Sequence, residues 1–319
     1  MTEATQTRKD FLSVLDFDAA DLERCLELAA QVKSDRSLGR HAPTADVLDG
    51  HHIAMLFDKP SLRTRTTFEI AIRELGGHLV ALQADVALGR REPVGDVARN
   101  LERWVDAVII RTFSQQVLQD FAAAARRLHV VNALTDQEHP CQAIADFLTL
   151  QERFGQLRGR TIAYVGDGNN VATSLAHGAS MLGVHLHIAS PEPYQLPHAV
   201  VQQATAVARH GARLRLFSEA ADAVAGADAV YTDTWTSMGQ ETEAELRRGI
   251  FAPYQVNDEL MSLAKPGALF MHCLPAHRGE EVTAEVFESE TSVVFDQAEN
   301  RLHGQKALLL MLLAPAAGL

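Results

Sequence analysis

The sequence has few cysteines, little positive charge and no long apolar run. Only three of its 319 residues are cysteine, and Cys25, Cys141 and Cys273 lie far apart and form no C-x-x-C pair. A disulfide framework and a thiolate metal site are therefore not expected. The protein is expected in a reducing compartment. The longest strongly apolar run, residues 307–314, is far short of the roughly 20 residues that span a bilayer.

Negative charge exceeds positive charge. The chain has 29 Lys and Arg against 41 Asp and Glu, a formal net charge of −12. A chain so acidic is not expected to bind nucleic acid or an anionic membrane, although clustered cations can still hold a small anion. Residues 1–10 are polar, so no secretory signal is expected and the protein is expected to be cytoplasmic.

The apolar residues, 47% of the chain, suffice for one large domain or two of ordinary size. Short apolar runs of strand length alternate with helical patterns, which is typical of parallel sheets covered on both faces by helices. The predicted strands are residues 53–57, 79–82, 107–110, 130–131, 161–165, 184–189, 214–217, 229–231, 268–271 and 293–295. The predicted helices include residues 11–34, 67–72, 96–105, 116–127, 141–153 and a C-terminal helix from about 304.

The alternation pauses at residues 135–140 and resumes at 161. This predicts an α/β protein with two doubly wound parallel-sheet domains linked by interdomain helices. The expected domains are residues 1–150 and 151–303, with residues 304–319 packing back on the first domain.

Polar residues repeatedly follow the predicted strands. In open α/β sheets, ligands bind beyond the carboxyl ends of the strands. If two such sheets face each other, we expect these loops to converge on one cleft, an arrangement that a structural protein does not need. The loops are residues 111–112, 139–142, 166–170, 233–239, 272–278 and 296–301.

The most basic segment lies where a predicted strand ends and a helix begins. Residues 59–65 have the sequence Lys-Pro-Ser-Leu-Arg-Thr-Arg. A helix N-terminus favours an anion, and Arg63 and Arg65 add forked donors that match phosphate oxygens. A phosphate site is predicted here, and an exposed basic turn is the alternative.

Four further residues are candidates for polar chemistry. Arg111 directly follows a buried strand, which favours a second phosphate clamp over a surface cation. His139 and Gln142 lie three apart at a helix start and so share one face, which suits the polarisation of a carbonyl, although a lone histidine is often structural. Cys273 lies at a strand end among polar residues, which favours function over an inert buried thiol; Cys141 is expected to pack on a helix.

Two other loops leave alternatives open. Residues 166–170, Gly-Asp-Gly-Asn-Asn, resemble a dinucleotide fingerprint, with Glu192 about twenty residues later. Val171 replaces its third glycine, so the asparagines are interpreted as ligand donors and acceptors instead. Asp233 and Ser237 suit an ammonium group, or cap a helix.

These residues together predict a two-domain enzyme that transfers a group from an acyl phosphate without a metal or an organic cofactor. An NAD-dependent dehydrogenase and a non-catalytic phosphate-binding relative are the alternatives.

The order and spacing of several motifs resemble those of the ornithine carbamoyltransferases, within the aspartate/ornithine carbamoyltransferase superfamily. The motifs extend over residues 50–307 and are specific when taken jointly; the aspartate-using relatives lack the Ser-Met-Gly and His-Cys-Leu-Pro motifs. The motifs are Ser-Leu-Arg-Thr-Arg at 61–65, Arg-Thr-Phe at 111–113, His-Pro-Cys-Gln at 139–142, Gly-Asp-Gly-Asn-Asn at 166–170, Asp233, Ser-Met-Gly at 237–239, His-Cys-Leu-Pro at 272–275 and Glu-Asn-Arg at 299–301.

The resemblance implies carbamoyl phosphate and L-ornithine as substrates, L-citrulline and phosphate as products, a role in arginine biosynthesis and assembly as a homotrimer. The first domain would bind carbamoyl phosphate, the second ornithine, and the Leu274–Pro275 bond would be cis. Another amine in place of ornithine is the alternative. The implied carbamoyl phosphate ligands are Ser61, Leu62, Arg63, Thr64, Arg65, Arg111, His139, Gln142, Leu274 and Arg301. The implied ornithine ligands are Asn170, Asp233, Ser237, Met238 and Cys273. The implied catalytic residues are Cys273, Asp233, His139, Arg63 and Arg301.

Two positions depart from the pattern of the family. Leu62 stands where many members have Thr, and Ala87 where many have a Gln that reaches carbamoyl phosphate in a neighbouring subunit. Gln83 or Arg90 is a candidate replacement for that contact. Both departures bear on phosphate affinity rather than on the type of reaction.

Overall fold

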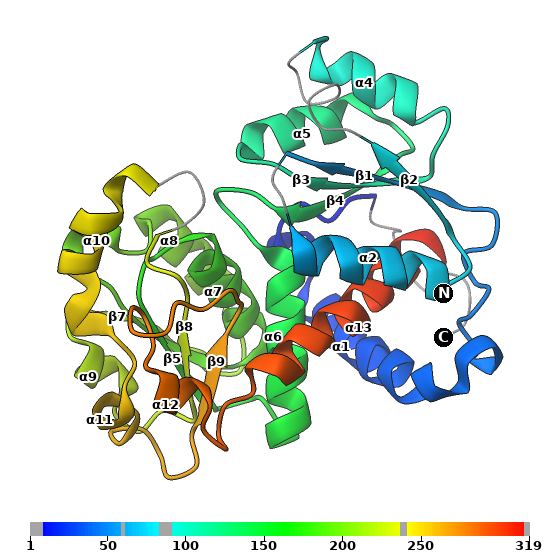
Figure 1. Ribbon diagram of the computed structural model, residues 1–319. Helices are drawn as coiled ribbons and strands as arrows, with labels where there is room; N and C mark the ends of the chain where they lie inside the picture. The colour runs from blue at the N-terminus through cyan, green and yellow to red at the C-terminus, as the bar shows by residue number, and fades with distance from the viewer. Residues whose placement is uncertain (1–8, 59–60, 83–90, 237–240, 316–319) are drawn as a thin grey trace. The chain divides into compact units, whose positions relative to one another are not determined.

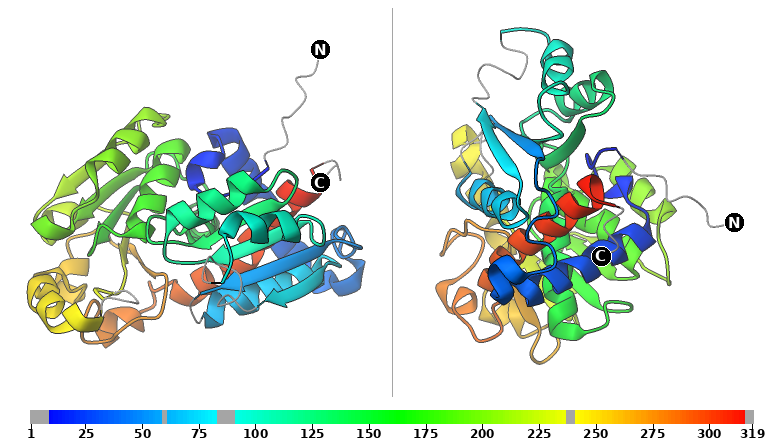
Figure 2. Two further views of the ribbon diagram at one scale, coloured as in Figure 1. Left: turned by 90° about the horizontal axis from the view of Figure 1, so that it is seen from above. Right: turned by 90° about the vertical axis from the view of Figure 1, so that its right-hand side faces the viewer.

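The expected fold class is confirmed in a computed structural model that describes residues 9–58, 61–82, 91–236 and 241–315 (Figures 1 and 2). Two parallel sheets alternate with helices along the chain. The strands are β1 (His52–Phe57), β2 (His78–Leu82), β3 (Ala107–Arg111), β4 (His129–Leu134), β5 (Thr161–Val165), β6 (His185–Ala189), β7 (Leu214–Phe217), β8 (Ala229–Thr232) and β9 (Leu269–His272). The α-helices are α1 (Ala19–Ser34), α2 (Leu62–Glu74), α4 (Val94–Leu101), α5 (Gln115–Ala124), α6 (Pro140–Phe154), α7 (Asn170–Leu182), α8 (His198–Ala206), α9 (Ala220–Val224), α10 (Ala244–Phe251), α11 (Asp258–Met261), α12 (Ala284–Phe287) and α13 (Val294–Leu313).

The chain divides into two compact units. Unit 1 comprises Met1–Leu148 with Asn300–Leu319, and unit 2 comprises Thr149–Glu299. The boundaries fall within α6 and within α13. Among the described residues, no helix has both the length and the apolarity needed to cross a bilayer.

Unit 1 contains a four-stranded sheet in the order β2-β1-β3-β4. The strand order reverses direction after β2, and because parallel crossovers are right-handed, α2 lies on one face and α4 and α5 on the other (Figure 1). Apolar side chains from alternate strand positions, such as Ala54, Val108 and Val130, form a core with Leu101 of α4 and Phe121 of α5. The point of reversal lies between β1 and β3, where ligands bind in open α/β sheets.

The helix α13 lies beside α1 within unit 1 (Figures 1 and 2). Lys33 of α1 donates a hydrogen bond to Asn300, at 2.8 Å, and Lys306 donates to Glu74 of α2, at 3.1 Å. Gly304 allows α13 to approach α6, because a Cβ there would lie 2.8 Å from the Ile144 side chain.

Unit 2 contains a five-stranded sheet in the order β7-β6-β5-β8-β9. The order reverses after β7, so right-handed crossovers place α7 and α8 on one face and α9 on the other. Ala163, Val230 and Phe270 of the sheet pack with Val224 of α9 and Phe251 of α10. The point of reversal lies between β5 and β8.

One predicted element is wrong. The helix whose body was predicted at residues 67–72 begins at Leu62, within the basic motif as expected, with Ser61 as its N-cap. The strand predicted at 293–295 is the start of α13, which therefore begins well before residue 304. The chain before α13 joins the sheet at a single bridge, between Ser292 and Phe270, so the longer helix prevailed over the short run of strand-forming residues.

Candidate functional site

The basic motif lies at the N-terminus of α2, after β1 and so beside the point of reversal in unit 1. Ser61 is the N-cap of α2, and its side chain makes no capping hydrogen bond. The first-turn N–H groups of a helix have no partner within the helix, and they carry the positive end of its dipole. The structure therefore places a hydroxyl at a helix N-terminus, where an anion is favoured.

Buried polar side chains converge on Thr64, in the first turn of α2. Arg301 of α13 donates a hydrogen bond to the Thr64 hydroxyl, and Arg111, the last residue of β3, lies 3.5 Å from the same oxygen. Arg301 is 3% exposed and Arg111 is 7% exposed. Two guanidinium groups from distant parts of the sequence therefore share one hydroxyl in unit 1.

His139 belongs to the same cluster. Burial lowers its pKa well below the usual 6.5, and the charges of Arg301 and Arg111 lower it further. The imidazole is therefore neutral at neutral pH and keeps one N–H with which it can polarise a carbonyl.

Gln142 lies one helical turn after His139. Its amide nitrogen donates to Asp146 at 2.8 Å, which fixes the orientation of the amide. Its oxygen is buried and accepts no hydrogen bond from the described residues. That oxygen is suited to accept a hydrogen bond from an amide NH₂ group.

The remaining residues of the basic motif are more exposed. Arg63 is half-buried and Leu62 and Arg65 are exposed, and the Arg65 guanidinium lies 5.9 Å from the centre of the Phe57 ring. Leu62 is 78% exposed. Residues 59–60 and the candidates Gln83, Ala87 and Arg90 lie outside the described residues.

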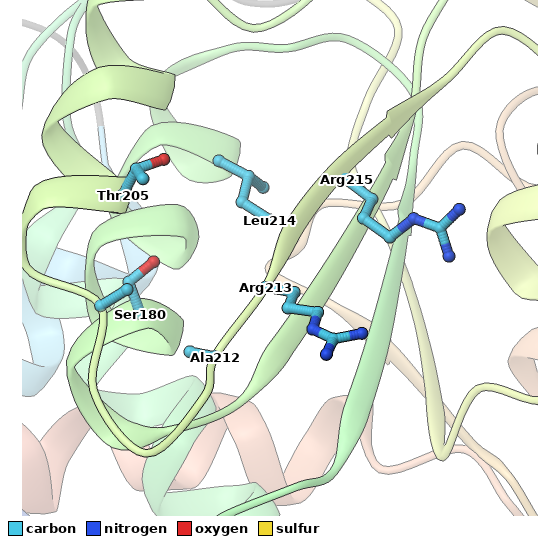
Figure 3. Close-up of a pocket in the computed structure, with 7 residues that line it drawn as sticks. Ser180, Thr205, Ala212, Arg213, Leu214 and Arg215 are labelled. Carbon is cyan, nitrogen blue, oxygen red and sulfur yellow. The ribbon is translucent and has the colours of Figure 1, made fainter.

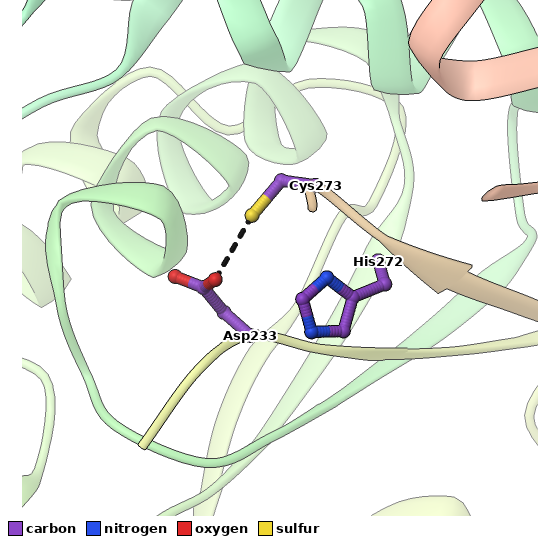
Figure 4. A group of neighbouring side chains, drawn as sticks. All are labelled: Asp233, His272 and Cys273. Carbon is purple, nitrogen blue, oxygen red and sulfur yellow. Dashed lines mark hydrogen bonds between the residues drawn. The ribbon is translucent and has the colours of Figure 1, made fainter. Parts of the chain in front are cut away.

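Asp233 is the centre of a second polar group, in unit 2 (Figure 4). It follows β8, beside the point of reversal between β5 and β8. Its carboxylate accepts hydrogen bonds from the Cys273 thiol at 3.0 Å, the Asn169 amide at 2.8 Å and the Thr234 N–H at 2.8 Å. Asp233 therefore organises side chains and caps none of the helices that the structure describes. The Cys273 thiol, 7% exposed, has a carboxylate partner.

His272 and Glu281 hydrogen-bond to each other next to this group. The Nε2 of His272 hydrogen-bonds to Glu281 at 3.1 Å, and its Nδ1 accepts the N–H of Leu274 at 2.8 Å. Leu274 has a φ of 59°, and the Leu274–Pro275 bond is cis, as the resemblance implies. Both nitrogens of His272 are thus engaged, so the neighbouring Asp233, His272 and Cys273 offer a metal ion only a carboxylate and a thiol.

The glycine-rich turn after β5 has a packing role. A Cβ on Gly168 would lie 2.4 Å from the backbone nitrogen of Leu196, so the glycine permits a close approach of two backbone segments. Asn169 caps α7 by accepting the N–H groups of Val171 and Ala172, and the predicted ligand Asn170 is the first residue of that helix. This geometry accounts for the glycine without a dinucleotide.

Asp167 of the same turn pairs with a buried arginine. It accepts a hydrogen bond from Arg247, whose guanidinium lies 4.4 Å from the centre of the Tyr194 ring. Burial raises the pKa of the Asp167 carboxyl to about 6, although the Arg247 charge and hydrogen bond act in the opposite direction.

Two other sequence predictions concern Ser237 with Met238 in unit 2 and Cys141 in unit 1. Ser237 and Met238 lie outside the described residues. Cys141 packs on α6 as expected: its thiol donates to the Asn132 carbonyl at 3.3 Å, and burial raises its pKa to about 12.

Sequence reasoning missed Glu281 and Tyr164 as parts of the unit 2 group, and it named Asn169 only as one of two asparagines interpreted as ligand donors and acceptors. The Tyr164 hydroxyl donates to the Asn169 oxygen at 3.3 Å, and burial together with the Asp233 charge raises its pKa. Asn169 belongs to the asparagine pair at 169–170, but the family resemblance implied Asn170, not Asn169, as the ornithine ligand. Glu281 had no local signal, because its partner is His272, nine positions earlier.

A separate pocket of about 430 Å³ in unit 2 contains none of the predicted site residues (Figure 3). It lies among α7, α8 and β7, and Leu214 points towards the helices while Arg213 and Arg215 point away from them. The residues that line it are Ser180, Thr205, Ala208, Ala212, Arg213, Leu214 and Arg215.

The comparisons with known proteins cover nearly the whole chain. Residues 9–152 match a family model described as the carbamoyl-P binding domain of aspartate/ornithine carbamoyltransferase, and residues 158–312 match its Asp/Orn binding domain. The chain is 50% identical to an ornithine carbamoyltransferase of Symbiobacterium thermophilum over 309 residues, which are 96% of this chain and 98% of that one.

Solved structures of similar proteins agree. An ornithine carbamoyltransferase from Pyrococcus furiosus matches with a TM-score of 0.92 and 46% identity, over 97% of this chain and 98% of that one. One from Thermus thermophilus matches with a TM-score of 0.85 and 43% identity, over 96% and 99% of the two chains.

The close approach at Gly168 predicts the effect of a single methyl group. Gly168→Ala should lower the free energy of unfolding by about 1–3 kcal/mol, because the new Cβ meets backbone atoms that no rotamer change can move. The control is Gly249→Ala in α10, where a new Cβ would have nothing within 4 Å. This substitution should raise the free energy of unfolding by up to about 1 kcal/mol, because alanine has the higher helix propensity. Denaturant unfolding measures both; equal stability of the two variants would contradict this account.

The depressed pKa of His139 predicts a pH dependence of stability. Below pH 6.5 the unfolded chain takes up a proton at this position that the folded chain does not, so this residue lowers the free energy of unfolding by up to about 1.4 kcal/mol for each unit that the pH falls. His139→Gln should remove that contribution, whereas His198→Gln, at an exposed position, should not. Denaturant unfolding between pH 7.5 and 5.5 measures it, and parallel profiles for wild type and His139→Gln would refute the buried neutral imidazole.

Proposed function

This chain belongs to the aspartate/ornithine carbamoyltransferase family, and from that premise we propose that it is an ornithine carbamoyltransferase. It transfers the carbamoyl group of carbamoyl phosphate to the δ-amine of L-ornithine and releases L-citrulline and phosphate. The observation that carries the proposal is the buried cluster of Arg111, Arg301 and neutral His139 at the N-terminus of α2. Such a cluster suits an acyl phosphate, which presents an anionic phosphate and a polarisable carbonyl.

Unit 1 binds carbamoyl phosphate. The α2 N-terminus with Ser61, Arg63 and Arg65 holds the phosphate together with Arg111, each charge-assisted hydrogen bond contributing roughly 1.5–3 kcal/mol. His139 and Arg301 polarise the carbamoyl oxygen. The Gln142 oxygen accepts a hydrogen bond from the carbamoyl NH₂ group. The hydrogen bond from the Gln142 amide nitrogen to Asp146 supports this role, because it fixes the orientation of the amide.

Unit 2 binds ornithine. The Asp233 carboxylate attracts its ammonium groups, with Asn170, Ser237 and Met238 as further ligands. An alkyl ammonium group has a pKa of about 10.4, so the neutral amine costs about 4–5 kcal/mol at pH 7. Asp233 and Cys273, held together at 3.0 Å, orient this amine and assist the loss of its proton.

The reaction then proceeds by addition and elimination. The neutral amine attacks the carbamoyl carbon, and the negative charge that develops on the oxygen is stabilised by His139 and Arg301. The intermediate collapses with loss of phosphate, whose charge is stabilised by the arginines that bound it. The Leu274 carbonyl accepts from the carbamoyl NH₂ group, and no step calls on a metal ion or an organic cofactor.

The proposal extends to the setting of the enzyme. We place it in arginine biosynthesis in the cytoplasm and expect it to assemble as a homotrimer, on the strength of the family resemblance alone.

The test is an assay of carbamoyl phosphate with a panel of amines. Ornithine should give citrulline and an equal amount of phosphate, whereas putrescine and N-acetylornithine, which lack a free α-amino group or carboxylate, should react much more slowly. Release of phosphate without ureido product would indicate hydrolysis, and a preference for another amine would refute ornithine as the substrate. Cys273→Ala should lower kcat/KM for ornithine at least tenfold, and unchanged ornithine kinetics would remove Cys273 from the mechanism.

A further inference from the structure

The segment that follows Pro275 in unit 2 contains a tightly held turn. Gly279 has a φ of +90° and donates its N–H to the Val282 carbonyl at 2.8 Å. The Gln255 amide donates to the carbonyls of Gly279 and Glu280, at 3.1 Å and 2.7 Å. The backbone of this turn is therefore fixed by residues both within it and outside it.

Three side chains with ligand atoms gather at this turn. One ligand atom each from His277, Glu280 and Glu281 lies within 4.8 Å of the others. The Nδ1 of His277 lies 3.7 Å from Oε2 of Glu281. The His277 side chain is 51% exposed, so the group is reached from solvent.

Glu281 is the unusual member of the group, because it is fully buried. Its Oε1 accepts hydrogen bonds from the His277 N–H at 2.6 Å and from His272 at 3.1 Å. Its Oε2 is also buried and accepts no hydrogen bond from any described residue. Burial of a carboxylate oxygen without a donor is costly, and such an atom commonly marks the place of an ion or a water molecule.

We propose that His277, Glu280 and Glu281 bind a divalent transition-metal ion such as Zn²⁺, with water in the remaining position. One imidazole and two carboxylates are a donor set that this class of ion accepts. Ligands about 2.0–2.2 Å from a tetrahedral ion lie about 3.3–3.6 Å apart, and the separation of 3.7 Å between His277 Nδ1 and Glu281 Oε2 is close to that range.

The local charges favour a cation. The two carboxylates bring two negative charges, and one of them is partly balanced by Arg248, whose Nε lies 3.0 Å from Oε1 of Glu280. Arg278 is directed elsewhere, to Glu288. A bound dication would supply the missing partner of Glu281 Oε2 while Oε1 keeps its hydrogen bond to His272.

The proposed ligands include neither Asp233 nor Cys273, although Glu281 also contacts His272 beside that pair. Cys273 offers a sulfur ligand, whereas the proposed site offers only nitrogen and oxygen ligands. Co²⁺ bound to sulfur and Co²⁺ bound to nitrogen and oxygen have different absorption spectra. The inference does not depend on the proposed function.

The experiment titrates chelator-treated full-length protein with Zn²⁺ by calorimetry and with Co²⁺ by absorption. Wild type should bind Zn²⁺, and the affinity should fall at least tenfold in His277→Gln and in Glu280→Gln. Cys273→Ala, and His52→Gln at an exposed histidine of unit 1, should retain it. The Co²⁺ spectrum of wild type should contain ligand-field bands without a thiolate charge-transfer band.

Three results would overturn the proposal. They are absence of Zn²⁺ binding to wild type, unchanged affinity in His277→Gln and Glu280→Gln, and loss of binding in Cys273→Ala together with a thiolate band. Circular dichroism of each variant establishes that it is folded, and because His277 and Glu280 are not buried, their substitution removes ligands without opening a core cavity.

Discussion

Two buried guanidinium groups beside a buried neutral imidazole are the constraint on which unit 1 depends. Removing an ion from water costs several kcal/mol, even after the protein relaxes around it. Arg111 and Arg301 incur that cost at the N-terminus of α2, where the helix dipole adds further positive potential. Burial, together with the charges of Arg301 and Arg111, lowers the pKa of His139 and keeps its imidazole uncharged. A site of this kind disfavours cations and is stabilised by an anion, which is the property that a phosphate-bearing substrate requires.

Unit 2 places a negative charge, where unit 1 places positive ones, at the equivalent position in its sheet. Its strand order also reverses, and the residues beside that reversal gather on one carboxylate, Asp233. Thiol, amide and backbone donors fix the orientation of this carboxylate, while Tyr164 and His272 fix the groups behind it. A fixed carboxylate attracts an ammonium group without reorganisation on binding. The arginine cluster of unit 1 and the Asp233 carboxylate of unit 2 therefore carry opposite charges, each matched in the proposed reaction to a group of one substrate.

The sequence predicted those features that depend on local pattern. The strand at 161–165 was predicted with its observed bounds, because a buried parallel strand is a continuous apolar run. The basic motif, Arg111 and the Asp233 region were found from polar residues that follow strands. The predicted start of α13, at about residue 304, was too late in the sequence, because the two valines and the phenylalanine at 293–295 resemble a strand.

Partners distant in sequence were beyond that reasoning. No periodicity relates Arg301 to Thr64, or Asn169 to Asp233, and these contacts exist only once the chain is folded. Glu281 was missed for the same reason, as was the packing role of Gly168, which depends on a backbone segment nearly thirty residues away. The resemblance supplied the names of ligands, whereas the structure supplies the reasons for their neighbours. The roles of the individual ligands stay predictions.

The most direct test is the dissociation constant of carbamoyl phosphate, measured by calorimetry for wild type, Arg111→Met and Cys273→Ala. If the buried cations of unit 1 bind the phosphate, Arg111→Met should weaken binding roughly 10- to 150-fold, equivalent to one charge-assisted hydrogen bond, and Cys273→Ala should bind as wild type does. Equal affinity of wild type and Arg111→Met would contradict the account.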